Sequence, residues 1–350
     1  MKHKHIEELA REFIVGRARR PANPRVQEIL LRFTADILKI IEDLDLSDDE
    51  VWTALDLLEE AGRNNEIKLM AVGLGVDRFL DIRQEEAEAR FGIGGGTPRS
   101  IEGPLYVHGA PVRRGLVRLD DDPDDQARVF FMQGQVTDVN NSPLPGAVVE
   151  VWHANSRGNY SHFDKSQSPY NLRRTIITDE RGRFQFRSLL PAGYGVPPDG
   201  ATQKMLDELG RHGQRPPHLH FFVHTEGHRK LTTQLNLPGS PYTYDDYAFS
   251  DRPSLVPEMV LIEEPDELAK RQLDQPFFLI DYNFRLHPDV PGAPSSDVER
   301  SRARDGLDPR KGSQEADTYY LHRLPVAEDG QLEMISSPMK TEALPLEEEA

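Results

Sequence analysis

The sequence predicts an α+β protein that is mainly β, in which a β-sandwich follows an N-terminal helical region. A change of pattern carries this prediction. Over about the first ninety residues, apolar side chains recur at steps of three and four, which is the period of a helix. Beyond Val129 the period becomes two, and short β-branched or aromatic runs are bounded by Gly, Pro, Asn or Asp. Several short strands without helical patterns between them favour an all-β sandwich or barrel.

The helical region contains recognisable start signals. Asn23-Pro24 suits an N-cap and a first helical position, and an apolar stripe runs from Val26 to Leu44. The segment Ser47–Glu50 predicts a capping box that starts a second helix. A third helical stretch, Asn65–Arg90, is interrupted by two glycines. We expect the apolar stripe to be core or a subunit interface, with a lipid or cofactor groove as the alternative.

Turn residues dominate from Gly92 to Asp125, and we expect irregular loops there, including a solvated turn at the acidic run Asp120–Asp125. The strand pattern begins after this segment. The predicted strands are Val129–Thr137, Ala147–His153, Arg183–Leu189, His218–Thr225, Leu231–Leu237 and Pro276–Leu286.

Composition excludes several classes of function. The 350-residue chain has a formal net charge of −17, which argues against a nucleic-acid partner. No apolar run approaches the roughly 20 residues that a membrane span needs. The N-terminus has no apolar signal core, so we expect a cytoplasmic protein without membrane insertion. The absence of Cys excludes disulfides, thiolate nucleophiles and Cys-based zinc or iron–sulfur sites, so any metal must be held by His, Tyr or carboxylates.

The segment Arg215–His220 contains a His-x-His pair at the start of a predicted strand. Residues two apart on a strand project to the same face, so both imidazoles can reach one ion. The alternative is a half-exposed or hydrogen-bonded pair. No His-x-Asp or His-x-Glu stands nearby to complete a two-His site for ferrous iron. Phenolates suit ferric iron, but spacing alone does not choose among the ten tyrosines, so the chemistry stays open.

A longer series of motifs resembles the intradiol ring-cleavage dioxygenase family, and within it most closely the catechol 1,2-dioxygenases. The resemblance covers roughly residues 20 to 290. The segments that carry it are Thr97–Tyr106, Pro143–Asn155, Gly158–Asp164, Asn171–Arg174, Thr178-Asp179, Leu190–Gly195, Thr202-Gln203, Gly210–His220 and Leu231–Gln234.

The resemblance implies a set of site residues. The implied ligands of Fe(3+) are Tyr160, Tyr194, His218 and His220. Tyr194 would also act as a base that takes a proton from the catechol, and Arg215 would stabilise negative charge during ring cleavage. Gln234 matches a family position near the substrate and oxygen. The implied apolar walls of the substrate site are Leu69, Val72, Ile101, Pro104, Tyr247 and Ala248.

We therefore expect Fe(III)-dependent intradiol cleavage of catechol by O2 to cis,cis-muconate. Hydroxyquinol enzymes of the family place an acidic residue near the position of Val72 and replace the Ile101–Pro104 loop sequence. Both features are absent here, which favours plain catechol. The alternatives are a chlorocatechol or hydroxyquinol 1,2-dioxygenase and a non-catalytic β-sandwich that binds a metal or a small aromatic molecule.

Three regions are expected. Residues 1–105 would form the helical linker and dimerisation region, residues 106–290 the catalytic β-sandwich with the iron site, and residues 291–350 an acidic, largely irregular tail. In the tail only Tyr319–Leu321 is expected to dock. The resemblance implies a homodimer formed through the N-terminal helices and allows a phospholipid to bind at that interface.

Overall fold

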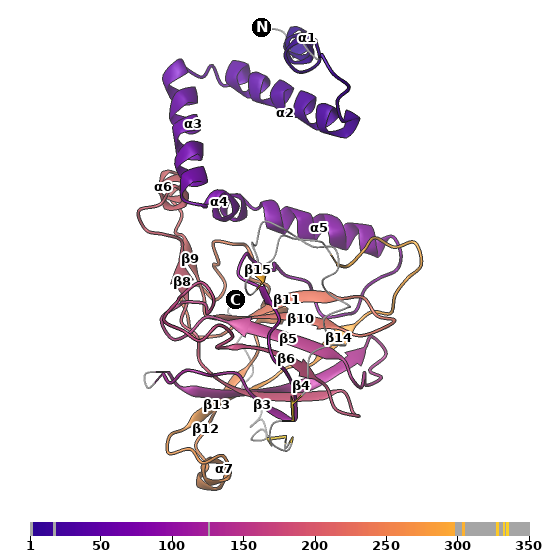
Figure 1. The fold of residues 1–350 in the computed structure, drawn as a ribbon, viewed down its shortest axis with the longest axis vertical. Helices are drawn as coiled ribbons and strands as arrows, with labels where there is room; N and C mark the ends of the chain where they lie inside the picture. Colours follow the sequence, from indigo (N-terminus) through magenta and orange to yellow (C-terminus); the bar gives the residue numbers. More distant parts are fainter. Residues whose placement is uncertain are drawn as a thin grey trace, which may run out of the picture. The chain divides into compact units, whose positions relative to one another are not determined.

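The computed structural model describes residues 3–16, 19–124, 127–297, 303–304, 327–328, 332 and 334–335. The chain divides into two compact units, Met1–Ile67 and Lys68–Ala350. In the first unit lie three helices, α1 (His3–Ile14), α2 (Pro24–Asp43) and α3 (Asp48–Arg63) (Figure 1).

Both predicted helix starts are confirmed. The Asn23 side chain accepts hydrogen bonds from the amides of Arg25 and Val26, which satisfies two of the amides left free at the start of α2. Ser47 and Glu50 form the expected capping box at the start of α3.

The apolar stripe of α2 is not core within this chain. Most of its side chains remain 40–67% exposed, as Phe33 (60%) and Leu44 (67%) illustrate, while Ile41 is half-buried. Apolar residues of α3 are similarly uncovered, and Trp52 is 64% exposed. This exposure contradicts the expectation of core, while the subunit interface and the lipid or cofactor groove both stay predictions. Among the described residues, no helix is both long and apolar enough to cross a membrane.

In the second unit the interrupted helical stretch is two helices, α4 (Ile67–Gly73) and α5 (Val76–Ala89). Gly75 separates them with a φ of +79°, a left-handed conformation that glycine adopts at little cost. Two further helices, α6 (Ala201–Glu208) and α7 (Pro265–Lys270), lie among the strands, where no helix was expected. That expectation is wrong because helices of eight and six residues are too short to show an apolar period.

In the described part of the chain the strands form two large sheets. One has the strand order β11-β10-β5-β6-β2-β16, and the other has the order β12-β13-β4-β7-β3 with β14 also paired to β4. Two small sheets pair β1 with β15 and β8 with β9. The strand bounds are β1 Val107–His108, β2 Val112–Arg114, β3 Leu116–Arg118, β4 Val129–Asp138, β5 Val148–His153, β6 Arg173–Ile177, β7 Arg183–Leu189, β8 Tyr194–Gly195, β9 Gln214–Arg215, β10 His218–His224, β11 Leu231–Asn236, β12 Met259–Ile262, β13 Phe277–Asp281, β14 Phe284–Leu286, β15 Ala303–Arg304 and β16 Ala327–Glu328.

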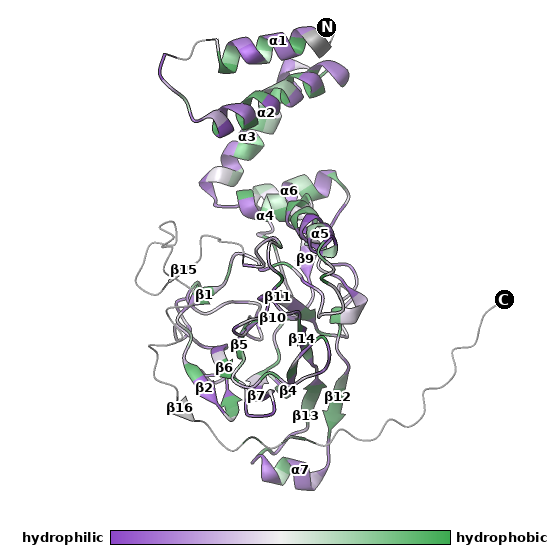
Figure 2. Ribbon diagram, turned by 90° about the vertical axis from the view of Figure 1, so that its right-hand side faces the viewer, coloured by the Kyte–Doolittle hydropathy of each residue, from purple (hydrophilic) through white to green (hydrophobic). Residues whose placement is uncertain are grey.

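The main core lies between the two large sheets, which confirms the sandwich. It contains Val149 and Phe221 from one sheet and Phe130 and Phe186 from the other, all fully buried or nearly so. Figure 2 shows hydrophobic residues along strands such as β13 and β14. Because side chains alternate along a strand, the residues of β10 that do not enter this core project from the other face of the sheet.

The five predicted strands from Val129 to Leu237 match β4, β5, β7, β10 and β11 to within one residue at either end. The sixth, Pro276–Leu286, is two strands that both pair with β4, with a break at Tyr282-Asn283. The expected irregular stretch before Val129 contains β1, β2 and β3, which are too short to show a period of two.

The tail contacts the sandwich at a residue that the sequence pattern did not indicate. Tyr319–Leu321 lies outside the described residues, but Ile335 is buried beside Phe131 and Phe277. The amide group of the Gln133 side chain donates to the Ile335 carbonyl and accepts from its N–H, each at 2.8 Å. The expectation that only Tyr319–Leu321 would dock is therefore wrong. Ile335 docks because its backbone hydrogen-bonds the buried Gln133 side chain while its own side chain packs in an apolar cluster.

Candidate metal centre

The two histidines of the His-x-His pair share a face of the sheet, as predicted. They lie on β10 between β5 and β11, and His220 is paired with Trp152 on one side and Gln234 on the other. The ring centroids of His218 and His220 are 4.8 Å apart. Trp152 stacks on His220 with an interplanar angle of 5° and fixes the orientation of that imidazole.

Tyr194 and Arg215 are brought together by the short antiparallel pair β8–β9, in which they are direct partners. The residue before Tyr194 must be a glycine, because a Cβ on Gly193 would lie only 2.5 Å from the carbonyl oxygen of Arg215. This close backbone approach carries the phenol and the guanidinium to the same end of the sheet as His218.

Tyr160 follows a tight turn after β5. The Asn155 side chain accepts hydrogen bonds from the amides of Arg157 and Asn159, both at 3.0 Å. Gly158 has a φ of +80°, and a Cβ at this position would lie 2.9 Å from the Cβ of Tyr194. The glycine therefore permits both the turn and the side-by-side placement of the two tyrosines.

The side chains of Tyr160, Tyr194 and His218 converge on one point. The Nε2 atom of His218 lies 3.2 Å from the Tyr160 hydroxyl and 3.3 Å from the Tyr194 hydroxyl, and the two hydroxyls are 3.5 Å apart. The Nδ1 atom of His218 is 2.7 Å from the Pro216 carbonyl oxygen, so Nδ1 carries the proton. The lone pair of Nε2 then points at the phenols, which is the arrangement of a histidine prepared to bind a metal.

Burial keeps both imidazoles neutral. His218 and His220 are at most 2% exposed. Burial, followed by the nearby Arg215 charge, lowers the pKa of His218 to about 3. Burial and then His218 lower the pKa of His220 well below its ordinary value. Neutral imidazole is the form that binds metals, so neither histidine needs to lose a proton first.

Tyr160 requires a nearby cation before its hydroxyl can become a phenolate. Burial, followed by the neighbouring Tyr194, raises the pKa of Tyr160 well above its ordinary value. A metal ion reverses this effect, because its charge favours the anionic oxygen. The four side chains therefore offer two oxygens that become anionic on metal binding and two neutral nitrogens, a donor set that fits a ferric ion.

Tyrosine is essential to this assignment. Within the part of the chain that the structure describes, no group of three or more His, Asp or Glu side chains could hold a metal ion. The site therefore depends on the oxygens of Tyr160 and Tyr194.

Arg215 is clamped by buried acceptors beside the candidate ligands. Its Nε and Nη2 atoms donate to the two carboxylate oxygens of Asp246 at 3.1 and 2.9 Å. Nη2 also donates to the Gln234 Oε1 atom at 2.8 Å and to the Ser250 hydroxyl at 3.1 Å. These bonds leave Nη1 directed at the centre, 3.4 Å from the Tyr194 hydroxyl.

Asp246 and Ser250 are functional neighbours that the sequence reasoning missed. Burial alone would raise the pKa of Asp246, but the ion pair with Arg215 outweighs it and holds that pKa below the ordinary carboxyl range. A buried Arg needs a carboxylate partner, so the prediction that Arg215 lies in the site implies that one is nearby. The chain has 59 acidic residues, and the sequence does not show which of them is the partner.

The predicted apolar wall is mostly assembled. Five of the six residues belong to one apolar cluster, which also includes Val196 and Leu206. The five are Leu69, Val72, Ile101, Tyr247 and Ala248. Pro104 is exposed and lies outside the cluster. The cluster lies next to the candidate metal ligands. The backbone amide of Ala248 donates to Asp246, which holds Arg215. Two residues after Ile101, a Cβ on Gly103 would lie 3.5 Å from the His220 ring.

Two known protein families match most of the chain. Residues 101–288 match the family described as Dioxygenase, and residues 23–92 match the one described as Catechol dioxygenase N terminus. The chain belongs to the intradiol ring-cleavage dioxygenase family. Both matches lie within the span of the resemblance, and residues beyond 288 fall outside them.

Several members of this family with assigned activities are similar to the chain. Catechol 1,2-dioxygenase of Acinetobacter baylyi is 46% identical over 282 residues, which cover 80% of this chain and 91% of the relative. Chlorocatechol 1,2-dioxygenase of Rhodococcus opacus is 31% identical over 76% of this chain and 98% of the relative. The solved structure of Acinetobacter radioresistens catechol 1,2-dioxygenase superposes with a TM-score of 0.83 at 48% identity, covering 87% of this chain and 99% of the other.

The division of this intradiol dioxygenase into regions stays partly a prediction. The compact units separate after Ile67, whereas the helical region is expected to run to residue 105. The difference arises because α4 contributes Val72 to the apolar cluster of the second unit. The expected boundary at 290 lies close to the end of the family match at 288.

Proposed function

We propose that this protein catalyses the Fe(III)-dependent intradiol cleavage of catechol by O2 to cis,cis-muconate, a reaction of aromatic-compound degradation. The observation that carries the proposal is the convergence of Tyr160, Tyr194 and His218 within 3.5 Å, with His220 beside them and Arg215 directed at the same point. The activity of the similar relatives supports catechol as the substrate.

Tyr160, Tyr194, His218 and His220 would hold the iron. When bound, ferric iron supplies a Lewis acid that acidifies the catechol hydroxyls and a redox centre that makes the ring reactive toward O2. The protein supplies the position of the substrate, the destination of its protons and the exclusion of water.

Tyr194 is suited to hold one of the two protons that catechol loses. It is the less buried of the two tyrosines, and its hydroxyl accepts a hydrogen bond from Arg215 Nη1 at 3.4 Å. A phenol has an ordinary pKa of about 10, much closer to that of a catechol hydroxyl than a carboxylate's. We therefore assign it a double role, as ligand and as base.

Arg215 is suited to stabilise negative charge on the substrate oxygens during ring cleavage. Its side chain is 5% exposed, and Asp246, Gln234 and Ser250 accept hydrogen bonds from the guanidinium. A charge that is already positioned in a water-poor site needs no reorganisation when the transition state forms. Gln234 acts in this proposal by orienting Arg215, since its amide group also donates to Asn236 at 2.6 Å.

The apolar cluster explains a preference for catechol. An added ring hydroxyl would face Leu69, Val72 and Ile101, none of which offers a hydrogen-bond partner. A chloro or methyl substituent would instead have to fit against these apolar side chains. One such group changes the discrimination between substrates by about 1–3 kcal/mol. Pro104, being exposed, would act at the rim of the site.

The test is a turnover panel on iron-loaded enzyme with catechol, 4-methylcatechol, 4-chlorocatechol and hydroxyquinol. We expect the highest kcat/KM for catechol, one O2 consumed per ring and cis,cis-muconate as the product by NMR. A higher kcat/KM for 4-chlorocatechol or hydroxyquinol would reassign the substrate. Saturable catechol binding without O2 uptake would instead favour the non-catalytic metal- or aromatic-binding sandwich.

We further propose a homodimer that forms through the N-terminal helices. The support is the uncovered apolar stripe, whose residues Val26, Phe33 and Leu44 are 50%, 60% and 67% exposed in the single chain. Continuous apolar faces of this kind mark interaction surfaces. A phospholipid at the same interface is part of the proposal, and mass spectrometry of an organic extract of the purified dimer tests it. A cytoplasmic location is proposed as well and fits the absence of cysteine.

A further inference from the structure

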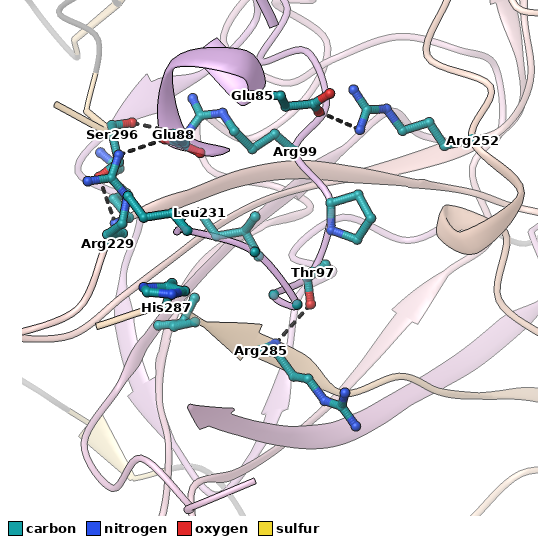
Figure 3. Close-up of a pocket in the computed structure, with 17 residues that line it drawn as sticks. Glu85, Glu88, Thr97, Arg99, Arg229, Leu231, Arg252, Arg285, His287 and Ser296 are labelled. Carbon is teal, nitrogen blue, oxygen red and sulfur yellow. Dashed lines mark hydrogen bonds and ion pairs between the residues drawn. The ribbon is translucent and has the colours of Figure 1, made fainter. Parts of the chain in front are cut away.

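A cavity of about 270 Å³ lies in the second unit, lined by residues of α5, the Gly94–Gly96 loop, β11 and β14. None of the candidate metal ligands or wall residues borders it. Figure 3 shows a group of charged side chains on one side of it, with Arg99 and Arg229 turned toward Glu88 and Arg252 turned toward Glu85. Leu231 lies beside this group (Figure 3).

The charges of this group do not balance. Arg229 pairs with Glu88 at 2.6 Å and Arg252 pairs with Glu85 at 2.6 Å, which uses both carboxylates. Arg99 is left with a distant contact to Glu88 at 4.0 Å and a long hydrogen bond to the Ser296 carbonyl at 3.4 Å. Three guanidinium charges therefore face two carboxylates, in a protein whose net charge is strongly negative.

The other cations on the cavity wall do not change this balance. Lys230 is paired with Asp297 at 3.1 Å. Arg285 uses its backbone amide to bond Thr97, and its guanidinium points away from the three arginines (Figure 3). Arg99 is thus the charge in this group that lacks a close partner.

The same arginines carry unused donors. Arg99 Nε, Arg229 Nε and Arg252 Nη2 are buried without a hydrogen-bond partner in the described part of the chain. The Arg99 and Arg229 side chains are 13% and 7% exposed. Unsatisfied buried donors on charged groups are costly and signal a missing acceptor. An anion in the adjacent cavity would supply such an acceptor and neutralise the excess charge.

The rest of the wall indicates what kind of anion fits. Ile93, Leu231 and Leu286 line the cavity opposite polar backbone and side chains. Its volume approaches the lower end of small-ligand sites, about 300 Å³, which is more than a bare inorganic ion fills. We propose that this cavity binds a small organic carboxylate, with the carboxyl group at Arg99 and Arg252 and the hydrocarbon part against Leu231.

The test uses hexanoate as the probe on the full-length, iron-loaded protein, with binding measured by isothermal titration calorimetry. Hexanol supplies the same hydrocarbon without charge, and inorganic phosphate supplies charge without hydrocarbon. We expect one hexanoate site per chain, no saturable binding of hexanol and weaker binding of phosphate.

Two variants and one matched control locate the site. Arg99→Gln leaves Glu88 paired with Arg229, and Arg252→Gln leaves Glu85, whose side chain is 38% exposed, to be solvated, so both should fold. Each should weaken hexanoate binding at least about tenfold, because a charge-assisted hydrogen bond is lost. Arg285→Gln is the matched control. It removes a guanidinium of the same cavity wall that points away from Arg99 and Arg252, and it should leave the affinity for hexanoate unchanged.

Several outcomes would overturn the proposal. Equal hexanoate affinity in Arg99→Gln, Arg252→Gln and the wild type would place any binding elsewhere, at the metal centre or at the N-terminal helices. Phosphate binding as tight as hexanoate would remove the role of the apolar wall. No saturable binding of either anion up to about 10 mM, an affinity below the useful range, would mean that the cavity is not an anion site. None of these results depends on turnover, so the proposed catalytic function stands or falls separately.

Discussion

Replacing Asp246 by Asn tests how Arg215 is held beside the candidate metal ligands. The Arg215 and Asp246 side chains are 5% and 0% exposed, and both Nε and Nη2 of Arg215 donate to the Asp246 carboxylate. Asn preserves the shape of the side chain but removes its charge. The guanidinium of Arg215 is then buried without a counter-charge.

The expected cost follows from that burial. Breaking a fully buried ion pair by removing one partner destabilises a protein by about 3–5 kcal/mol. For a unit of this size, each kcal/mol lowers the unfolding midpoint by about 2–4 °C, so a fall of roughly 6–20 °C is expected. Turnover should fall as well, because Nη1 of Arg215 loses its fixed position beside Tyr194.

Asp245→Asn is the matched control, one residue earlier in the chain. The Asp245 side chain is 74% exposed and contacts only the imidazole of His212, at 3.1 Å, among the salt bridges that the structure describes. A surface substitution of this kind changes stability by no more than about 0.5 kcal/mol. Differential scanning fluorimetry of both variants and the wild type, followed by initial rates with catechol, makes the comparison.

The pH dependence gives the reasoning a second check. The pKa of Asp246 is lowered in the folded protein, so its ion pair stabilises fully above the unfolded carboxyl pKa of about 3.9. That stabilisation is lost as the pH falls through the lower folded pKa. The gap in midpoint between wild type and Asp246→Asn should therefore stay constant near neutrality and narrow only below about pH 4. Equal midpoints for Asp246→Asn and Asp245→Asn at pH 7 would refute the argument.

Three further predictions concern other parts of the molecule. Arg215→Leu should retain iron but lose about 10²-fold or more in turnover, and an unchanged rate would remove Arg215 from the mechanism. Phe33→Glu places a charge on the exposed stripe of α2 and should shift the protein from dimer to monomer in light scattering after gel filtration; a persisting dimer would locate the interface elsewhere. Ile335→Ala should destabilise the second unit by roughly 2–4 kcal/mol, and deletion of residues 292–350 by at least as much, while the folded enzyme keeps its turnover. Unaltered denaturation curves would show that Ile335 does not dock in solution.

The features that the sequence predicts correctly depend on local rules. Ser47 and Glu50 announce the start of α3 because a capping box needs only four consecutive residues. The shared face of His218 and His220 follows from the period of a strand, and the strands themselves follow from alternating apolar runs. The strand β6 was not predicted, because its sequence begins with two arginines, Arg173 and Arg174, which are both buried in the structure.

The tyrosines needed more than a local rule. Tyr160 reaches the centre through a turn built by Asn155 and Gly158, and Tyr194 reaches it through a two-residue strand paired with Arg215. Neither arrangement follows from the spacing of residues along the chain. The order of motifs around them supplied the resemblance to the intradiol family that singled them out.

Other residues left no signal in the sequence. Asp246 is one carboxylate in a loop, and its role appears only when the fold places it against Arg215. Ile335 is one apolar residue in a polar tail. Its binding site forms only when the fold brings it to Gln133 and Phe131, which lie more than two hundred positions earlier in the chain. Contacts of this kind between distant single residues have no period or motif by which they could be predicted.

The most direct test of the central claim is the colour of the iron-loaded protein. Phenolate ligation by Tyr160 and Tyr194 predicts one ferric ion per chain, a burgundy solution and a visible charge-transfer band that anaerobic catechol shifts. Tyr160→Phe, which removes a single oxygen atom, should greatly weaken the band and the iron content. A colourless wild-type protein with one iron per chain, or a Tyr160→Phe variant with the full band, would contradict the assignment of the tyrosines as ligands.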